Sequence, residues 1–280
     1  MTRDPHEDDP AMPGDAAALS NEQLARYSRQ IVLPEIDESG QQRLARSRVL
    51  VLGLGGLGSP VTTYLAGAGV GRLVLVDPDR VDVSNLHRQI LHRTGTVGTA
   101  KTDSARASLT ALNPDVHIVT HASRLHGDAL RDAVAGVDLV VDGTDNFESR
   151  FELNRVCVAL RRPLVYGAVV GLEGQASVFR NDRDDSPCYA CLYEDVAGLP
   201  DAERPTSNWE NCSGQGVLGP VAGLVGCIQA TEALKVLLGM DSGLAGRLLL
   251  IDARSMEFRS FPLRKRASCS ACGVPAATRG

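Results

Sequence analysis

The chain has 280 residues, of which 43% are hydrophobic, enough to build the core of one large α/β domain. Its formal charge of −5 gives no basic surface at the level of composition, so neither a nucleic acid nor an anionic membrane is the expected partner. No hydrophobic run is long and uninterrupted enough to span a bilayer, and the acidic start lacks the apolar core of a secretion signal, so we expect a cytoplasmic protein.

An acidic segment precedes the part that we expect to fold. Residues 1–18 are rich in Asp, Pro and Ala without a hydrophobic period, which predicts a disordered tail before a single domain over residues 19–280. Ser20 and Gln23 then have the spacing of a capping box. Together with hydrophobic residues at helical spacing, they predict a helix that ends near Ile31.

From residue 49 onward, short hydrophobic strands alternate with amphipathic helices. We expect strands over 49–53, 73–77, 116–120, 138–145 and 163–170, and helices over 41–46, 56–69, 99–112 and 147–160. Beyond residue 171 the segments 173–179 and 247–263 favour antiparallel strands, and 216–238 favours a buried helix. The fold class is therefore α/β, with a Rossmann-like, doubly wound, mostly parallel sheet and a C-terminal antiparallel extension.

A glycine-rich stretch, VLVLGLGGLGSP, follows directly from the first expected strand. Gly53, Gly55 and Gly58 form a G-x-G-x-x-G array with Gly56 inside it, a pattern that lets a helix N-terminus approach phosphate. Asp77 ends the next strand roughly twenty positions later, where a carboxylate binds ribose hydroxyls in dinucleotide folds. These residues predict an adenosine site, although the same glycine pattern also occurs as a simple tight turn.

The residues after Asp77 favour ATP over a nicotinamide dinucleotide. Asn85, Arg88, Gln89 and Lys101 follow it in the chain and are expected beside the carboxyl end of the sheet. Arg88 and Lys101 place two positive charges beyond the adenosine. A triphosphate and a departing pyrophosphate need such charges, whereas a nicotinamide does not.

Two C-x-x-C pairs lie far apart in the chain, Cys188 with Cys191 and Cys269 with Cys272. In a cytosolic protein, two such pairs fit a closed tetrahedral zinc site that stabilises structure rather than catalyses. A redox C-x-x-C is the alternative, but it normally sits between a strand and a helix with one activated thiol. We therefore expect a zinc site with four cysteine ligands.

Several motifs in one order resemble the MoeB/ThiF family of ubiquitin-activating-enzyme-like adenylyltransferases. They cover about residues 24–272 and read RYSRQI, GLGGLGS, DPDRVDVSNLHRQ, VGTAK, DGTDNFESR, GAVVGLEGQASVF, CYACL, NCSGQGVLGPVAGLVGCIQATEALK and CSAC. The resemblance implies ATP- and Mg²⁺-dependent adenylation of the C-terminal glycine of a ubiquitin-like sulfur carrier protein that ends in Gly-Gly. Pyrophosphate would leave, and the carrier would be activated for thiocarboxylate formation. The resemblance further implies a nucleotide-binding part over about 19–170 and a zinc-containing, carrier-binding part over about 171–280.

The resemblance also implies roles for single residues. It assigns ribose binding to Asp77, phosphate contacts to Asn85, Arg88 and Lys101, magnesium to Asp145, and to Arg29 a contact with the ATP of the other protomer of a homodimer. Two alternatives stay open, because Asp142 is a second candidate for the metal-linked carboxylate and Asp145 could instead cap the helix that follows it.

Cys212 aligns with a family cysteine that lies just before the GVLGP segment. Its polar, glycine-flanked surroundings suit a reactive thiol that takes the activated carrier covalently, and a spectator thiol on a loop is the alternative. The chain ends soon after the second cysteine pair, so we expect the sulfur donor to act in trans.

Other functions compete with this interpretation. They are adenylation of a small-molecule or tRNA-linked carboxylate, an NAD(P)-dependent oxidoreductase and a nonenzymatic scaffold. The motifs leave the pathway open among molybdopterin, thiamin, cysteine and a specialised thio-metabolite.

Overall fold

The computed structural model describes residues 18–193 and 216–273, so residues 1–17 of the expected tail, and Cys212, lie outside the described residues. Its strands are β1 (Arg48–Leu52), β2 (Arg72–Val76), β3 (His117–His121), β4 (Leu139–Asp142), β5 (Leu164–Val170), β6 (Glu173–Phe179), β7 (Arg247–Asp252) and β8 (Glu257–Pro262). Its helices are α1 (Asn21–Ile31), α2 (Asp37–Arg46), α3 (Gly58–Gly67), α4 (Lys101–Leu112), α5 (Gly127–Ala135), α6 (Phe147–Ala159), α7 (Tyr189–Leu192) and α9 (Gly219–Leu237).

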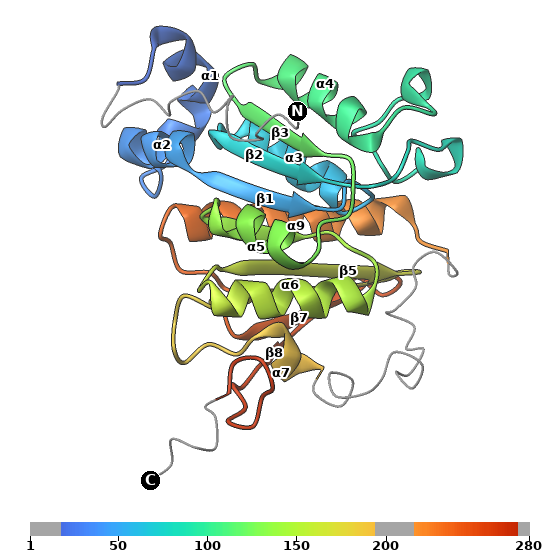
Figure 1. Cartoon of the computed structure of the whole chain (residues 1–280). Coiled ribbons are helices and arrows are strands. Elements are labelled where there is room, and N and C mark those ends of the chain that lie inside the picture. The colour runs from blue at the N-terminus through green and yellow to red at the C-terminus, as the bar shows by residue number, and fades with distance from the viewer. Residues whose placement is uncertain (1–17, 194–215, 274–280) are drawn as a thin grey trace.

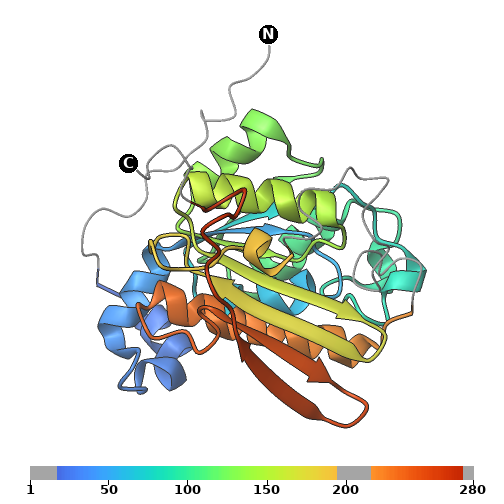
Figure 2. The same ribbon diagram turned by 90° about the horizontal axis from the view of Figure 1, so that it is seen from below.

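The strands form one eight-stranded sheet in the order β3-β2-β1-β4-β5-β6-β7-β8. Strands β1 to β5 run parallel, and β6, β7 and β8 pair antiparallel. Figure 2 shows β7 and β8 as a hairpin at one edge of the sheet. The expected doubly wound, mostly parallel sheet with a C-terminal antiparallel extension is therefore confirmed.

Helices cover both faces of the parallel part of the sheet (Figure 1). Within β1, Val49 and Val51 point to the face covered by α3, α4 and α9, while Leu50 and Leu52 point to the face covered by α5 and α6. A central parallel strand is buried on both sides, which is why β1 reads as a continuous hydrophobic run rather than an alternating one.

The elements differ from the expected ones mainly at their ends. Helix α5 was not expected, although its two buried residues, Leu130 and Val134, lie four positions apart on one face, which is the spacing of an amphipathic helix. Helix α2 begins at Asp37 rather than at residue 41, and the Asp37 carboxylate accepts the N–H of Gly40 at 3.0 Å. Helix α9 begins at Gly219, with Pro220 in its first turn, where proline fits because it lacks an N–H donor.

Helix α9 is the one helix of the described ranges long and apolar enough to cross a membrane by length and composition. In the fold it packs against α3 and against strands β5 and β6. Val221, Ala222 and Val225 are buried in that contact. The apolar character of α9 is thus explained by its place in the core.

Candidate active site

A cavity of about 410 Å³ opens at the carboxyl ends of β1, β2 and β4. The sheet is built outward in both directions from β1 and β4, and ligands of open α/β sheets bind at that point. The structure brings nearly all of the expected nucleotide residues into its lining: Gly53, Gly55, Gly56, Asp77, Asn85, Arg88, Gln89, Lys101 and Asp145. Gly58 lies just behind them as the first residue of α3.

The glycine turn between β1 and α3 leaves no room for a side chain at Gly53 or Gly58. Gly53 has φ +87°, and a Cβ atom there would lie 2.5 Å from the carbonyl oxygen of Gly143. A Cβ atom on Gly58 would overlap the carbonyl oxygen of Gly53. Glycine is therefore required at both positions, and the tight turn directs the N-terminus of α3 toward the cavity.

Asp77, which directly follows β2, stabilises the glycine turn through a hydrogen bond. Its buried carboxylate accepts the N–H of Leu54 at 2.7 Å and the N–H of Asp79 at 2.9 Å. Burial raises the pKa of Asp77, while the nearby charge of Lys101 and these hydrogen bonds oppose the rise. The structure thus gives Asp77 a role in shaping the turn, and its contact with ribose stays a prediction.

Lys101 is held at the cavity by two carboxylates. Its buried ammonium lies 2.8 Å from Asp79 Oδ2 and 3.8 Å from Asp77 Oδ1. Asp79 was not among the expected site residues, although it lines the cavity and 65% of its side chain is exposed. Its position just after β2 is the sequence signal that could have found it.

Arg88 and Gln89 lie over the glycine turn. The arginine side chain lines the cavity, passes close to Gly56, and donates to Asn85 Oδ1 at 2.9 Å and to the carbonyl oxygen of Ser84 at 3.3 Å. Gln89 is buried, and its Oε1 accepts no hydrogen bond from the described part of the chain. A buried polar atom in a cavity lining is suited to a ligand that donates to it.

Of the two candidate metal carboxylates, only Asp145 faces the cavity. It is exposed, and Asn146 Nδ2 approaches its Oδ1 at 3.4 Å. Asp142 is 1% exposed and bonds to Thr144 instead, and burial raises its pKa. The helix cap is Asn146, whose side chain accepts the N–H of Ser149, so the alternative that Asp145 caps α6 is wrong. An accessible carboxylate in the lining of the cavity fits Mg²⁺, which prefers oxygen ligands.

Arg124 is a cavity residue that the sequence analysis missed. It follows β3 and reaches the cavity from the side of β2, together with Leu125. Arg124 lies shortly after the end of β3, and this position could have indicated a cavity residue. The sequence analysis assigned no site residue to the segment after β3.

Arg29 is not among the described residues that line this cavity in its own chain. It lies on the exposed side of α1. The role expected for it, a contact with the nucleotide of a second protomer, stays a prediction.

The four paired cysteines meet in one cluster, formed by α7 and the segment after β8. Their sulfur atoms all lie within 4.8 Å of one another, with Cys188 Sγ 3.7 Å from Cys269 Sγ and Cys191 Sγ 3.4 Å from Cys272 Sγ. Tetrahedral zinc with Zn–S bonds of about 2.3 Å sets sulfur atoms roughly 3.8 Å apart. All four thiols are free of disulfides, so the cluster fits a structural zinc ion held by four thiolates.

Comparisons with known proteins agree with this geometry. Sulfur carrier protein ThiS adenylyltransferase of Escherichia coli (strain K12) is 46% identical over 255 residues, which are 91% of this chain and 97% of the relative. Adenylyltransferase and sulfurtransferase MOCS3 of Culex quinquefasciatus is 47% identical over 91% of this chain, and the chain spans only 56% of that relative's length. A crystal structure of E. coli MccB with MccA-N7isoASN shares the fold, with a TM-score of 0.76 at 22% identity over 91% of this chain and 76% of MccB.

The family itself is shown by a match that covers most of the chain. Residues 27–271 match the ThiF family. This range contains the residues of the nucleotide cavity and three of the four clustered cysteines. The resemblance first seen in the sequence motifs is confirmed, and the chain belongs to the ThiF family.

Proposed function

We propose that this protein uses ATP and Mg²⁺ to adenylate the C-terminal carboxylate of a ubiquitin-like sulfur carrier protein that ends in Gly-Gly. One observation carries the proposal. The glycine turn, the cations Arg88 and Lys101 and the accessible carboxylate of Asp145 line one cavity. An NAD(P)-dependent oxidoreductase would need neither the two cations nor the metal carboxylate.

The reaction suits a site that works by charge and position. The carrier carboxylate is ionised at neutral pH and forms a bond to the α-phosphorus of ATP, while the bond between the α-phosphorus and the bridging oxygen breaks and pyrophosphate leaves. Both reactants are anionic, so Arg88 and Lys101 would bind the phosphates and offset their repulsion. Mg²⁺ at Asp145 would supply further neutralisation of the phosphate charge when bound. No general base is required, because the nucleophile is already deprotonated.

Similarity to the ThiS adenylyltransferase over 97% of its length supports a protein carrier as the substrate. A small-molecule or tRNA-linked carboxylate is less well supported, and the charge of −5 does not favour a tRNA. In this proposal the enzyme is cytoplasmic, the sulfur donor acts in trans and the zinc ion is structural. A homodimer would place Arg29 at the cavity of the second protomer, and Cys212 would act after adenylation.

The direct test incubates the protein with ATP, Mg²⁺ and each of several candidate carriers, and then records the intact carrier mass. We expect one carrier to gain an adenylyl group, and the same carrier without its C-terminal glycine to stay unchanged. Titration calorimetry should show ATP binding in the presence of Mg²⁺. Tight NAD(H) binding without detectable ATP binding would contradict the proposal.

A further inference from the structure

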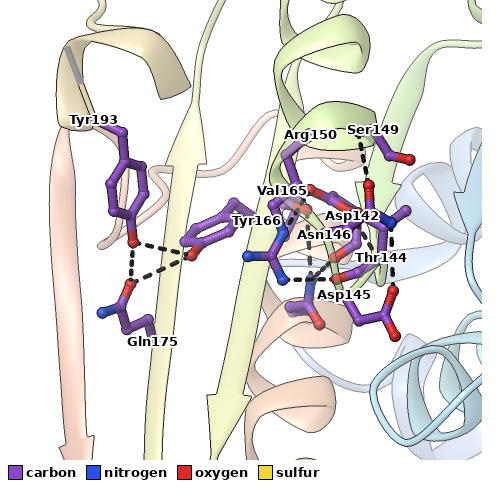
Figure 3. A network of polar contacts seen from close by, with 11 residues as sticks. Asp142, Thr144, Asp145, Asn146, Ser149, Arg150, Val165, Tyr166, Gln175 and Tyr193 are labelled. Atoms are coloured by element: carbon purple, nitrogen blue, oxygen red, sulfur yellow. Dashed lines mark hydrogen bonds and ion pairs between the residues drawn. The ribbon is translucent and has the colours of Figure 1, made fainter. Parts of the chain in front are cut away.

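The turn that carries Asp145 is held by polar contacts with side chains of β4 and α6 (Figure 3). Thr144 precedes Asp145, and each of its polar groups is bound. Its N–H and Oγ–H donate to Asp142 Oδ1 at 2.8 and 2.7 Å, and its carbonyl oxygen accepts from Arg150 at 2.7 Å. Thr144 is therefore held through its N–H, its hydroxyl and its carbonyl oxygen by side chains from β4 and α6.

The two side chains that hold Thr144 are themselves buried and opposite in charge. Asp142 and Arg150 are each 1% exposed, and Arg150 Nε lies 4.0 Å from Asp142 Oδ2. The guanidinium also lies over the ring of Tyr166, 5.5 Å from its centroid. Charges this deeply buried persist only when they are paired, so the unit resists rearrangement.

The neighbouring residues restrict the turn further. Gly143 donates to the carbonyl oxygen of Leu52 at 2.8 Å, which ties the turn to the end of β1 and to the glycine turn. On the other side of Asp145, Asn146 accepts the N–H of Ser149 at 2.9 Å as the cap of α6. Asp145 thus sits between two fixed residues, although its own carboxylate makes only the long contact with Asn146.

The Tyr166 ring, over which the Arg150 guanidinium lies, is held through its hydroxyl by residues close to the cysteine cluster. The hydroxyls of Tyr166 and Tyr193 both approach Gln175 Oε1, at 3.3 and 2.8 Å, and Figure 3 shows these three side chains meeting at their polar ends, with Tyr166 next to Arg150. Tyr193 directly follows α7, the helix that begins just after Cys188 and contains Cys191. The cysteine cluster and the Asp145 turn therefore share one packed network.

We propose that Asp142, Thr144 and Arg150 form a positioning unit that fixes the Asp145 carboxylate toward the cavity for Mg²⁺. None of the three needs to touch the metal. The inference rests on the proposed function, since it assumes that Mg²⁺ binds with ATP at Asp145. In this proposal, Asp142, Thr144 and Arg150 determine the affinity of the Asp145 carboxylate for Mg²⁺.

The test removes one hydrogen bond and leaves the charges in place. Thr144→Val keeps the shape of the side chain but loses the Oγ–H bond to Asp142, and Thr144→Ser keeps that bond. We expect Thr144→Val to weaken ATP binding about tenfold when Mg²⁺ is present, the size of effect of a lost hydrogen bond to a carboxylate, and to leave binding without Mg²⁺ unchanged. Thr144→Ser should bind like the wild type. Thr231→Val is the matched control, because Thr231 Oγ1 bonds to a carbonyl oxygen on the exposed side of α9.

A double-mutant cycle tests whether Thr144 acts through Asp145. The combined Thr144→Val and Asp145→Ala protein should bind ATP and Mg²⁺ no more weakly than Asp145→Ala alone. Calorimetry provides the affinities, and thermal unfolding reports any general loss of stability. The positioning role is refuted if the two losses add, if the loss with Thr144→Val is equal with and without Mg²⁺, or if Thr144→Val binds like the wild type. A wild-type protein that binds no ATP at all would instead refute the proposed function, and the positioning role with it.

Discussion

Removal of the zinc ion that we propose for the cysteine cluster should destabilise the protein by an amount that the structure allows us to estimate. The cluster joins Cys188 and Cys269, which are 81 residues apart in the chain. Closing a loop of that length in the unfolded chain corresponds to about 4.5 kcal/mol at 25 °C in the chain-entropy treatment of a cross-link. An unfolding entropy of about 2.1 cal/mol/K per residue gives roughly 0.6 kcal/mol/K for a chain of this size, so the melting temperature should fall by about 8 °C.

The assay compares wild-type protein, protein treated with a chelator and Cys269→Ser by thermal unfolding and elemental analysis. We expect one zinc ion per chain in the wild type, and a lower melting temperature in the other two samples. Cys227→Ser is the matched control, since Cys227 lies on α9 outside the cluster. It should retain its zinc. Wild-type protein that contains no zinc, or that keeps its full thermal stability after chelation, would refute the reasoning.

Three further changes test other parts of the site. Gly58→Ala should abolish ATP binding and destabilise the fold by about 1–3 kcal/mol through overpacking against the glycine turn, as measured by calorimetry and thermal unfolding, whereas Gly223→Ala, with open space around it, should not. Equal mixing of Arg29→Ala and Lys101→Ala proteins should restore activity at about a quarter of the sites if a symmetric dimer shares them, and no recovery after verified subunit exchange would exclude a shared site. Cys212→Ala should keep carrier-dependent pyrophosphate exchange but slow thiocarboxylate formation, and nonreducing mass spectrometry of the wild type should show a carrier adduct at this cysteine. If Cys212→Ala forms the thiocarboxylate at the wild-type rate and the wild type shows no such adduct, the covalent role of Cys212 is wrong.

Local patterns in the sequence were sufficient to identify most of the fold. The hydrophobic run of β1, the glycine turn and the polar residues after β2 predicted a parallel sheet with a nucleotide at its carboxyl edge. Helix α5 was missed although Leu130 and Val134 lie at helical spacing, and α2 begins earlier than expected, at Asp37, whose carboxylate accepts the N–H of Gly40. Hydrophobic periodicity predicts that a helix or strand is present more reliably than it predicts the first and last residues of that element.

The sequence by itself determined most of the strands and helices along the chain and the residue types needed to bind a triphosphate, because periodicity, turn residues and motif spacing act over short stretches of chain. Only the tertiary structure decided that Asp145 faces the cavity while Asp142 is buried outside its lining, beside Arg150. It also decided that Arg124, from the end of β3, reaches the same cavity. Both outcomes depend on which strands lie side by side and on the path of each turn, and those are set by packing between residues far apart in the chain.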